Sequence, residues 1–236
     1  MSFDNWLKEH TTVDKPLIPA STVIPIRNTG TGIEILMMRR NSKLSFAEGM
    51  WVFPGGKVDE ADSKGNDNDY ATAVTAAVRE CEEESGLQLD PENLTYYSHW
   101  LPPVEAPKRF STWFFLTETP EGKVTIDNGE ITDHAWFTPN EALTEAHAKR
   151  IEILPPTWVT LFDLSQFLEV DDAIESVTSR GPRAYATKIV PTSEGLAAIW
   201  EGDSEYSSES ELPKSQRHRL VMTDTVWKFQ LGMITD

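Results

Sequence analysis

The stretch from Trp51 to Leu87 reads WVFPGGKVDEADSKGNDNDYATAVTAAVRECEEESGL and ends in the acidic run RECEEESGL. From about Ala71 to Glu84, residues compatible with a helix predominate, and the apolar ones recur at spacings that build one stripe. The acidic run is therefore predicted to lie on a helix. At about 3.6 residues per turn, Glu80, Glu83 and Glu84 stand on one face of that helix.

These three carboxylates repel one another. Each like-charged pair on an exposed helix costs roughly a few tenths of a kcal/mol. The acids also lie toward the C-terminal end of the helix, where the macrodipole disfavours negative charge. A divalent cation bound between them would turn this repulsion into attraction, so the acidic face is where we expect the chemistry.

The overall composition limits the classes of partner. The chain has 236 residues, 39% of them hydrophobic, and a formal net charge of -17. A large negative charge makes DNA, RNA and anionic membranes unfavourable partners, so we expect no nucleic-acid and no membrane partner. Cys81 is the only cysteine, which excludes an intrachain disulfide and favours a reducing compartment, the cytoplasm. Neither an export signal nor a membrane span is expected.

The order of the elements predicts a mixed sheet of strands with helices. A polar arm at residues 1–17 precedes two β-rich runs, 21–27 and 33–40, joined by a hairpin turn. An aromatic strand at 49–56 ends in a turn at its two glycines, and the Gly-rich, acidic segment 59–69 is predicted to be a flexible loop before the helix. The further predicted elements are strands at 92–102, 108–117 and 130–137 with a turn at 127–129, a short helix from Pro139, a helix from Leu154 to about Val177, and strands at 184–190 and 218–222.

Two local features near the acidic helix suggest contact with an anion. Gly55 and Gly56 form a turn that permits close approach of the backbone to a ligand. Arg39, Arg40 and Lys43 cluster just after the second strand, in a chain with few basic residues. This cluster is either a solvated loop or an island that binds phosphate groups.

The acidic helix and the double glycine together resemble the Nudix hydrolases. That family carries a box written Gly-x5-Glu-x7-Arg-Glu-U-x-Glu-Glu-x-Gly-U, where U is a bulky apolar residue. The second half of the box is present from Arg79 to Leu87, with Cys81 as a small U, and the preceding Phe-Pro-Gly-Gly is also typical of the family. The resemblance implies an α+β or α/β Nudix fold, in which a mixed sheet is sandwiched between helices.

The first half of the box departs from the family pattern. The second glycine lies 79 − 56 = 23 positions before Arg79, whereas the family has 14, so the box holds nine extra residues. Counted back from Arg79, the position of the first Glu falls on Ala71. The sequence leaves open which acid replaces it; the four candidates are Asp59, Glu60, Asp62 and Asp69.

The resemblance also implies the roles of site residues. Glu80, Glu83 and Glu84 would bind Mg2+ or Mn2+, and Glu83, Glu80 and Arg79 would act in catalysis. An acid before the last strand often adds to such sites, and Glu130 is the candidate here, six residues before Trp136. The predicted substrate-binding residues are Gly55, Gly56, Arg39, Arg40 and Arg109.

Shorter pieces, KRFSTWFFL, ILPPTWVTLFDL and RHRLVM, resemble the acyl-CoA diphosphatase branch of the family. That branch implies cleavage of coenzyme A or acyl-CoA to 3',5'-ADP and a phosphopantetheine. The alternatives are the same reaction on NADH, ADP-ribose or dinucleotide polyphosphates, and a Nudix-fold module that binds a ligand without cleaving it. We expect a Nudix domain at 18–150 and a C-terminal helical and β extension at 151–236 packed on it; the oligomeric state, a homodimer included, stays open.

Overall fold

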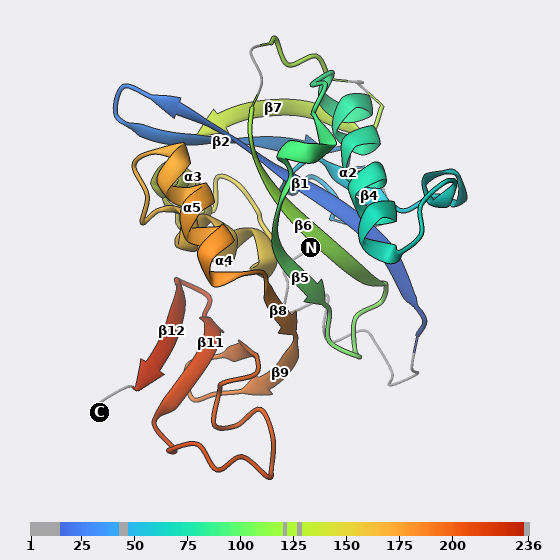
Figure 1. The fold of residues 1–236 in the computed structure, drawn as a ribbon. Helices are drawn as coiled ribbons and strands as arrows, with labels where there is room; N and C mark the ends of the chain where they lie inside the picture. The colour runs from blue at the N-terminus through green and yellow to red at the C-terminus, as the bar shows by residue number, and fades with distance from the viewer. Residues whose placement is uncertain (1–14, 43–46, 120–121, 127–128, 234–236) are drawn as a thin grey trace.

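A mixed eight-stranded sheet forms the centre of the protein (Figure 1). The computed structural model describes residues 15–42, 47–119, 122–126 and 129–233. The main path of the sheet runs β3-β2-β1-β6-β5-β8, with β4 paired to β1 and β7 paired to β2. Its strands are β1 (Leu17–Thr29), β2 (Gly32–Arg40), β3 (Trp51–Val52), β4 (Gly55–Lys57), β5 (Thr95–Leu101), β6 (Arg109–Glu118), β7 (Ile131–Phe137) and β8 (Arg183–Ala186).

Helices cover both faces of this sheet. Figure 1 shows α2 (Asp69–Ser85) on one side and α3 (Pro139–His147), α4 (Pro155–Leu164) and α5 (Val170–Arg180) on the other. Successive residues of β1 alternate between the two faces, as expected for a strand. Val23 packs into the core under α2, whereas Ile24 and Ile26 pack into the core under α4 and α5. The predicted fold class, a mixed sheet between helices, is confirmed.

Helix α2 forms where the sequence predicts it. Asn68 caps its start, with a side chain that accepts a hydrogen bond from the amide of Ala71, and Gly86 caps its end with a left-handed φ of 72°. Its buried stripe includes Ala73, Ala77 and Cys81. Burial raises the pKa of the Cys81 thiol to about 11, so this cysteine is a neutral packing residue.

The segment before α2 is ordered, which corrects the prediction of a flexible loop at 59–69. A short 3-10 helix, η1 (Glu60–Ser63), begins with a capping box between Asp59 and Asp62. The side chain of Asn66 then donates to the backbone oxygen of Asp62 at 2.7 Å and to Oγ1 of Thr75 in α2 at 2.9 Å. The insertion is thus tied to the helix that it precedes.

Two predictions for the C-terminal part are also corrected. The single helix expected to run from Leu154 to about Val177 is two helices, because α4 ends at Leu164 and α5 starts at Val170. The expected strand at 184–190 is divided at Thr187 between β8, which pairs in parallel with β5, and β9 (Lys188–Pro191). The strand β9 begins a separate antiparallel sheet of order β12-β11-β10-β9.

The remaining strands of this second sheet are β10 (Leu196–Ile199), β11 (Gln216–Met222) and β12 (Trp227–Met233). A second 3-10 helix, η2 (Pro91–Asn93), precedes β5. Most of the predicted arm at 1–17, Lys43, and the first two residues of the turn predicted at 127–129 lie outside the described residues.

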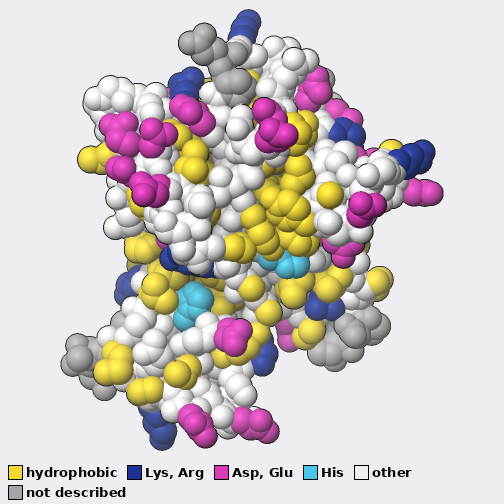
Figure 2. Space-filling model, in the orientation of Figure 1, with side chains coloured by type: hydrophobic (Ala, Val, Ile, Leu, Met, Phe, Trp, Pro, Cys, Tyr) yellow, Lys and Arg dark blue, Asp and Glu magenta, His cyan; other side chains and the backbone are white. Residues whose placement is uncertain are grey.

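Aromatic side chains form a row over β5 and β6. Tyr70, at the start of α2, contacts Tyr96 and Trp113, and Trp113 contacts His99. Figure 2 shows hydrophobic side chains gathered in the middle of this face. In the part of the chain that the structure describes, no helix is both long enough and apolar enough to cross a membrane.

Candidate active site

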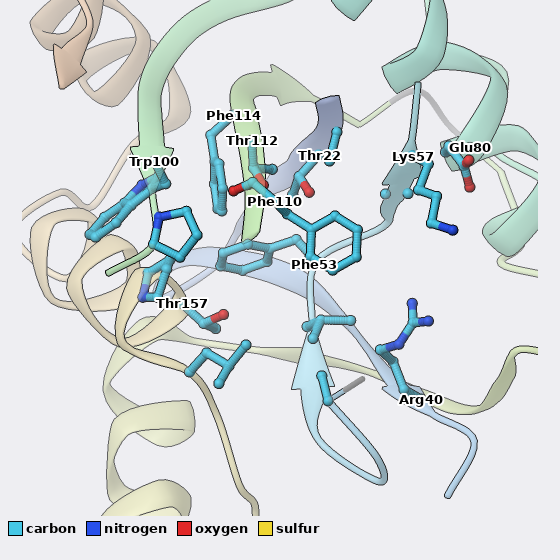
Figure 3. A pocket seen from close by; sticks show the side chains of 18 of the residues that line it. Thr22, Arg40, Phe53, Lys57, Glu80, Trp100, Phe110, Thr112, Phe114 and Thr157 are labelled. Carbon is cyan, nitrogen blue, oxygen red and sulfur yellow. The ribbon is translucent and has the colours of Figure 1, made fainter. Parts of the chain in front are cut away.

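A cavity of about 660 Å³ lies between α2, the centre of the large sheet and the start of α4. Its two ends differ in chemistry, as Figure 3 shows: Glu80, Lys57 and Arg40 lie on one side, and the rings of Trp100, Phe110 and Phe114 lie on the other. All four predicted acids line it, namely Glu80, Glu83, Glu84 and Glu130. The structure therefore brings the predicted acidic residues to one cavity.

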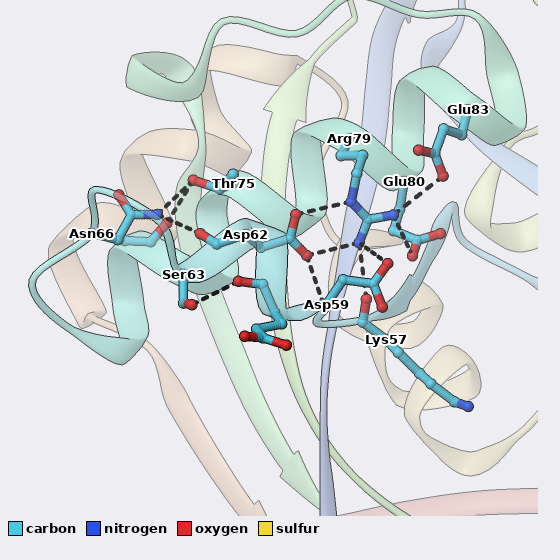
Figure 4. A network of polar contacts seen from close by, with 11 residues as sticks. Lys57, Asp59, Asp62, Ser63, Asn66, Thr75, Arg79, Glu80 and Glu83 are labelled. Carbon is cyan, nitrogen blue, oxygen red and sulfur yellow. Dashed lines mark hydrogen bonds and ion pairs between the residues drawn. The ribbon is translucent and has the colours of Figure 1, made fainter.

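Arg79 is the centre of a network of polar contacts at the acidic end (Figure 4). Its guanidinium donates two hydrogen bonds to the carboxylate of Asp62, at 2.9 and 2.8 Å. A third nitrogen donates to Glu80 at 2.9 Å and to Glu83 at 3.2 Å. Arg79 also donates to the backbone oxygen of Lys57 at 3.0 Å. One planar side chain thus fixes three carboxylates and the turn after the double glycine.

Asp62 is the acid that pairs with Arg79 from the loop. It is 2% exposed, and Arg79 holds its pKa below the usual range although burial opposes the shift. The other candidates do not make this contact: Asp59 comes only within 3.9 Å of Arg79, and no hydrogen bond or ion pair joins Arg79 to Glu60 or Asp69 among the described residues.

This contact corrects the alignment of the box. Asp62 lies 62 − 56 = 6 positions after Gly56, which is the Gly-x5 spacing of the family pattern with Asp in place of Glu. We infer from this spacing and from the contact with Arg79 that Asp62, and not Ala71, takes the place of the first acid, which puts the extra residues after Asp62. Counting forward from the glycine, as well as back from the arginine, would have found it in the sequence.

Glu84 is the most buried of the helical acids. Its Oε2 accepts a hydrogen bond from the amide of Gly55 at 2.9 Å, and Arg40 lies 3.8 Å from its Oε1. Burial raises the pKa of Glu84 to about 8; the Gly55 amide and Arg40 oppose this shift, whereas the charges of Glu80 and Glu130 add to it. A nearby cation would stabilise the charged form of this buried carboxylate.

Glu80 packs directly against Gly56. A methyl group on Gly56 would lie 2.4 Å from the carboxylate of Glu80, so only glycine leaves room for this carboxylate in its present position. Burial raises the pKa of Glu80, and the repulsion from Glu83 and Glu130 adds to that, whereas Arg79 lowers it. The double glycine thus supports the acidic face: Gly55 through its amide and Gly56 through its lack of a side chain.

Arg40 connects the helix to the loop before β7. It lies 3.6 Å from the carboxylate of Glu130, and the backbone oxygen of Glu130 accepts from the amide of Asn41 at 2.7 Å. The Nε of Arg40 is buried and has no hydrogen-bond partner among the described residues. A buried donor without a partner, beside a cavity, suits a ligand that brings an acceptor such as a phosphate oxygen.

The other predicted basic residues do not reach the cavity. Arg39 is exposed and is not part of the cavity wall, and Arg109 donates to the backbone oxygen of Lys15 at 3.0 Å. Lys57 and Lys108 do line the cavity, and the sequence analysis missed both. For Lys57 the signal was available, because it directly follows the double glycine; Lys108 lies beside Arg109 with nothing to distinguish the two.

The acids suit Mg2+ or Mn2+, because both ions prefer hard oxygen ligands. Burial is the main cause of the raised pKa values of Glu80 and Glu84, and the charge of Glu130 adds to both shifts. Among the described residues, however, no three acidic, histidine or cysteine side chains already converge as metal ligands. Glu80 and Glu83 instead bind Arg79, and Glu84 binds Gly55, so we expect these side chains to exchange partners when a cation enters.

Comparison with known proteins identifies the family of the chain. A family model described as the NUDIX domain matches residues 16–156. Putative nudix hydrolase 7 of Caenorhabditis elegans is 28% identical over 188 residues, which is 64% of this chain and 61% of that protein. Acyl-coenzyme A diphosphatase NUDT19 of Xenopus laevis is 22% identical over an alignment of 298 residues, which is 85% of this chain and 78% of that protein.

The fold also has a solved counterpart. The crystal structure of a Nudix hydrolase from Alicyclobacillus acidocaldarius superposes with a TM-score of 0.63 at 21% identity, covering 69% of this chain and 97% of that one. The family model covers more than half of the chain and includes Arg79, Glu80, Glu83 and Glu84. The chain belongs to the Nudix family of pyrophosphohydrolases.

Proposed function

We propose that this protein is a divalent-metal-dependent diphosphatase that cleaves coenzyme A or acyl-CoA into 3',5'-ADP and a phosphopantetheine or acyl-phosphopantetheine. One observation carries the proposal. A single cavity joins an acidic end with nearby cationic side chains to an apolar, aromatic end. An acyl-CoA combines the matching parts in one molecule, a diphosphate and a long chain that ends in an apolar group.

At the acidic end we assign Glu80, Glu83 and Glu84 to binding of Mg2+ or Mn2+, because Nudix hydrolases generally use divalent metals. A bound cation would neutralise the diphosphate and lower the pKa of an attacking water. Glu80, Glu83 or Glu130 would accept the proton of that water, since all three line the cavity. Arg79 holds the carboxylates in place, through the contacts that it makes with Glu80 and Glu83.

The cationic side chains of the cavity wall would bind the phosphates. Arg40 offers its buried Nε, and Lys57 and Lys108 add two ammonium groups. The backbone of Gly55 and Gly56 would lie close to the diphosphate. Arg39 and Arg109 are not part of the cavity wall, so the structure offers no support for the substrate-binding role predicted for them.

The similarity to acyl-coenzyme A diphosphatase NUDT19 of Xenopus laevis supports this choice of substrate, and it extends over most of the chain. The division into a Nudix domain at 18–150 and an extension at 151–236 remains part of the proposal. A cytoplasmic location, predicted from the single buried cysteine, remains part of the same proposal.

A substrate panel tests the proposal. Purified protein is incubated with Mg2+ or Mn2+ and equal concentrations of coenzyme A, 3'-dephospho-coenzyme A, decanoyl-CoA, NADH, ADP-ribose and a dinucleotide polyphosphate, and the products are identified by mass. We expect 3',5'-ADP from coenzyme A and from decanoyl-CoA, and a loss of rate without metal. Faster hydrolysis of NADH or ADP-ribose than of every CoA species would contradict the proposed substrate and leave the diphosphatase chemistry in place.

A further inference from the structure

The apolar end of the cavity is built partly by residues after the matched Nudix domain. Trp100 and Leu101 are the last two residues of β5, and they line the cavity together with Thr187. Thr187 lies at the point where β8 passes into β9, and its amide donates to the backbone oxygen of Leu101 at 2.9 Å. The extension therefore forms part of the cavity wall and does not merely cover the outside of the domain.

The ring of Trp100 is held from behind by Tyr185 of β8. The two rings are stacked at 3.9 Å between centroids with an angle of 10° between their planes. The backbone fixes this pair, because Trp100 and Tyr185 are register partners in the parallel pairing of β5 with β8. Both side chains are buried, at 4% and 2% exposure. The orientation of a cavity-lining ring is therefore set by a residue that is not part of the cavity lining.

Trp200 completes this support. Its ring stands at 89° to that of Trp100 and at 82° to that of Tyr185, which encloses Trp100 by edge-to-face contacts. Its Nε1 donates to Oγ1 of Thr187 at 3.0 Å. Trp200 directly follows β10 of the second sheet and is fully buried. Through Trp200, that sheet contacts both Trp100 and Thr187 of the cavity wall.

We propose that Tyr185 is a positioning residue for the apolar end of the cavity, and that it thereby determines preference for substrates with an apolar chain beyond the diphosphate. This inference rests on the proposed function for the identity of that chain, an acyl thioester. Tyr185 acts through Trp100: without the stacked ring behind it, the indole gains space to rotate and the wall loses its flat apolar surface. The acidic end has no contact with Tyr185 among the described residues, so the chemical step should be spared.

The test compares coenzyme A with decanoyl-CoA, because the two substrates share the nucleotide and the diphosphate and differ only in the apolar chain. For Tyr185→Ala we expect KM for decanoyl-CoA to rise about fivefold, the loss expected for one aromatic stack, while kcat and the KM for coenzyme A stay within about twofold. Tyr185→Phe keeps the ring and should keep the wild-type KM for decanoyl-CoA.

The matched control is Ile199→Ala. Ile199 is fully buried in the second sheet, in a separate cluster with Ala197 and Val221, and it has no part in the cavity wall. This variant should destabilise the extension while leaving KM for both substrates unchanged. If Tyr185→Ala changes KM for both substrates equally, or for neither, the inference is overturned; the same holds if Ile199→Ala reproduces its selective effect.

A binding measurement separates this inference from the proposed function. Calorimetric titration with decanoyl-CoA in the absence of metal requires no turnover. If the wild type hydrolyses no CoA species, the proposed function fails, and the inference still stands when Tyr185→Ala alone weakens decanoyl-CoA binding about fivefold. If the wild type does not bind decanoyl-CoA, or if the variant binds it equally well, the inference fails too.

Discussion

Helix α2 and the segment after residue 156 contribute to the same cavity in different ways. From α2 come charged groups that follow one another in the sequence, Arg79 to Glu84, and a helical turn is enough to bring them together. From the later segment come two threonines of the wall, Thr157 and Thr187, and the two rings that pack against Trp100. These residues are separated in sequence and are assembled by tertiary contacts, including the pairing of β5 with β8. The charged groups of the cavity therefore come from neighbouring positions in the sequence, whereas the shape of its apolar end depends on tertiary packing.

This difference leads to separable mutational effects. Changes on α2 or in the turn that faces it should lower kcat and leave the fold intact. Changes in the extension should alter stability or KM and leave kcat nearly intact. Each prediction below tests one side of this division.

The largest effect on turnover is expected for Glu83→Gln. Glu83 lines the cavity, is largely exposed and contacts Arg79 at 3.2 Å, so the amide should fold normally but bind a cation poorly. Because the loss of a group that only supports a metal ligand already costs about 10–100-fold, we expect kcat to fall by at least about 100-fold. Steady-state kinetics at saturating Mg2+ measures this.

Glu82→Gln is the matched control for that variant. Glu82 precedes Glu83 in the same helix, is exposed, and accepts a hydrogen bond from Gln88 outside the cavity. Its replacement removes the same charge and should leave kcat within about twofold, since an exposed charge outside the site has little effect. Normal turnover of Glu83→Gln at saturating metal would contradict the assignment of Glu83 as a metal ligand.

The next effect is expected for Asp62→Asn. The substitution keeps the size of the side chain but removes the charge that receives two hydrogen bonds from Arg79. Arg79 would then be free to shift toward Glu80 and Glu83 and compete with a cation, and we expect kcat to fall by about 10–100-fold. A steeper dependence of rate on metal concentration should accompany the loss.

Glu60→Gln controls for Asp62→Asn. Glu60 belongs to the same 3-10 helix, is exposed and does not line the cavity. If the two variants lose equal activity, the effect comes from the short helix and not from the contact with Arg79.

The acidic helix, expected at about 71–84, is found at 69–85, because apolar spacing and charge pattern are local properties. Counted back from Arg79, the position of the first box acid falls on Ala71, and the sequence left Asp62 as one of four candidates to replace it. Asp62 lies in η1 and Arg79 in α2, and the direction in which the connection at residues 64–68 turns the chain back onto α2 has no local signal.

The break between α4 and α5 has no local signal either. The amide of Val170, which begins α5, donates to the side chain of Asn28 at 2.9 Å. Asn28 lies in the hairpin of β1 and β2, at a sequence separation of 142 residues. A helix start that is set by a distant side chain cannot be read from nearby residues, and the continuous apolar stripe favoured one long helix. The cavity has no local signal either, because it is formed by contacts between distant segments of the chain.

Gly56→Ala and Gly55→Ala should separate activity from stability within one turn. A methyl group on Gly56 would displace the end of a flexible side chain, that of Glu80, so we expect about a tenfold lower kcat with little change in Tm. A methyl group on Gly55 would lie 2.4 Å from the backbone oxygen of Ser21 in β1, and we expect a loss of about 1–3 kcal/mol of stability.

Gly30→Ala serves as the neutral control, because a methyl group there has no neighbour within 4 Å among the described atoms. Kinetics and thermal unfolding of the three variants check the prediction. Equal Tm values for Gly56→Ala and Gly55→Ala would contradict the prediction that the first variant loses activity and the second loses stability.

The smallest effect on turnover is expected for Asp203→Asn in the extension. Burial opposes ionisation of Asp203, but hydrogen bonds from the side chain of Arg219 and from the amides of Glu205 and His218 outweigh it and hold its pKa below the usual range. A lowered pKa in the folded state stabilises the protein above the unfolded pKa of about 3.9, and this contribution disappears as the pH falls through the folded value.

At pH 7 the Asp203→Asn variant should therefore lose about 1–3 kcal/mol of unfolding free energy, because the buried Arg219 keeps only the half-exposed Glu205, 3.2 Å away, as a carboxylate partner. Its kcat should stay within about twofold, since neither residue lines the cavity. As the pH falls below about 4, the stability of the wild type should approach that of the variant. Urea unfolding at a series of pH values measures the difference; a gap that stayed constant into acid would mean that the size and shape of this side chain, and not its charge, anchor the second sheet.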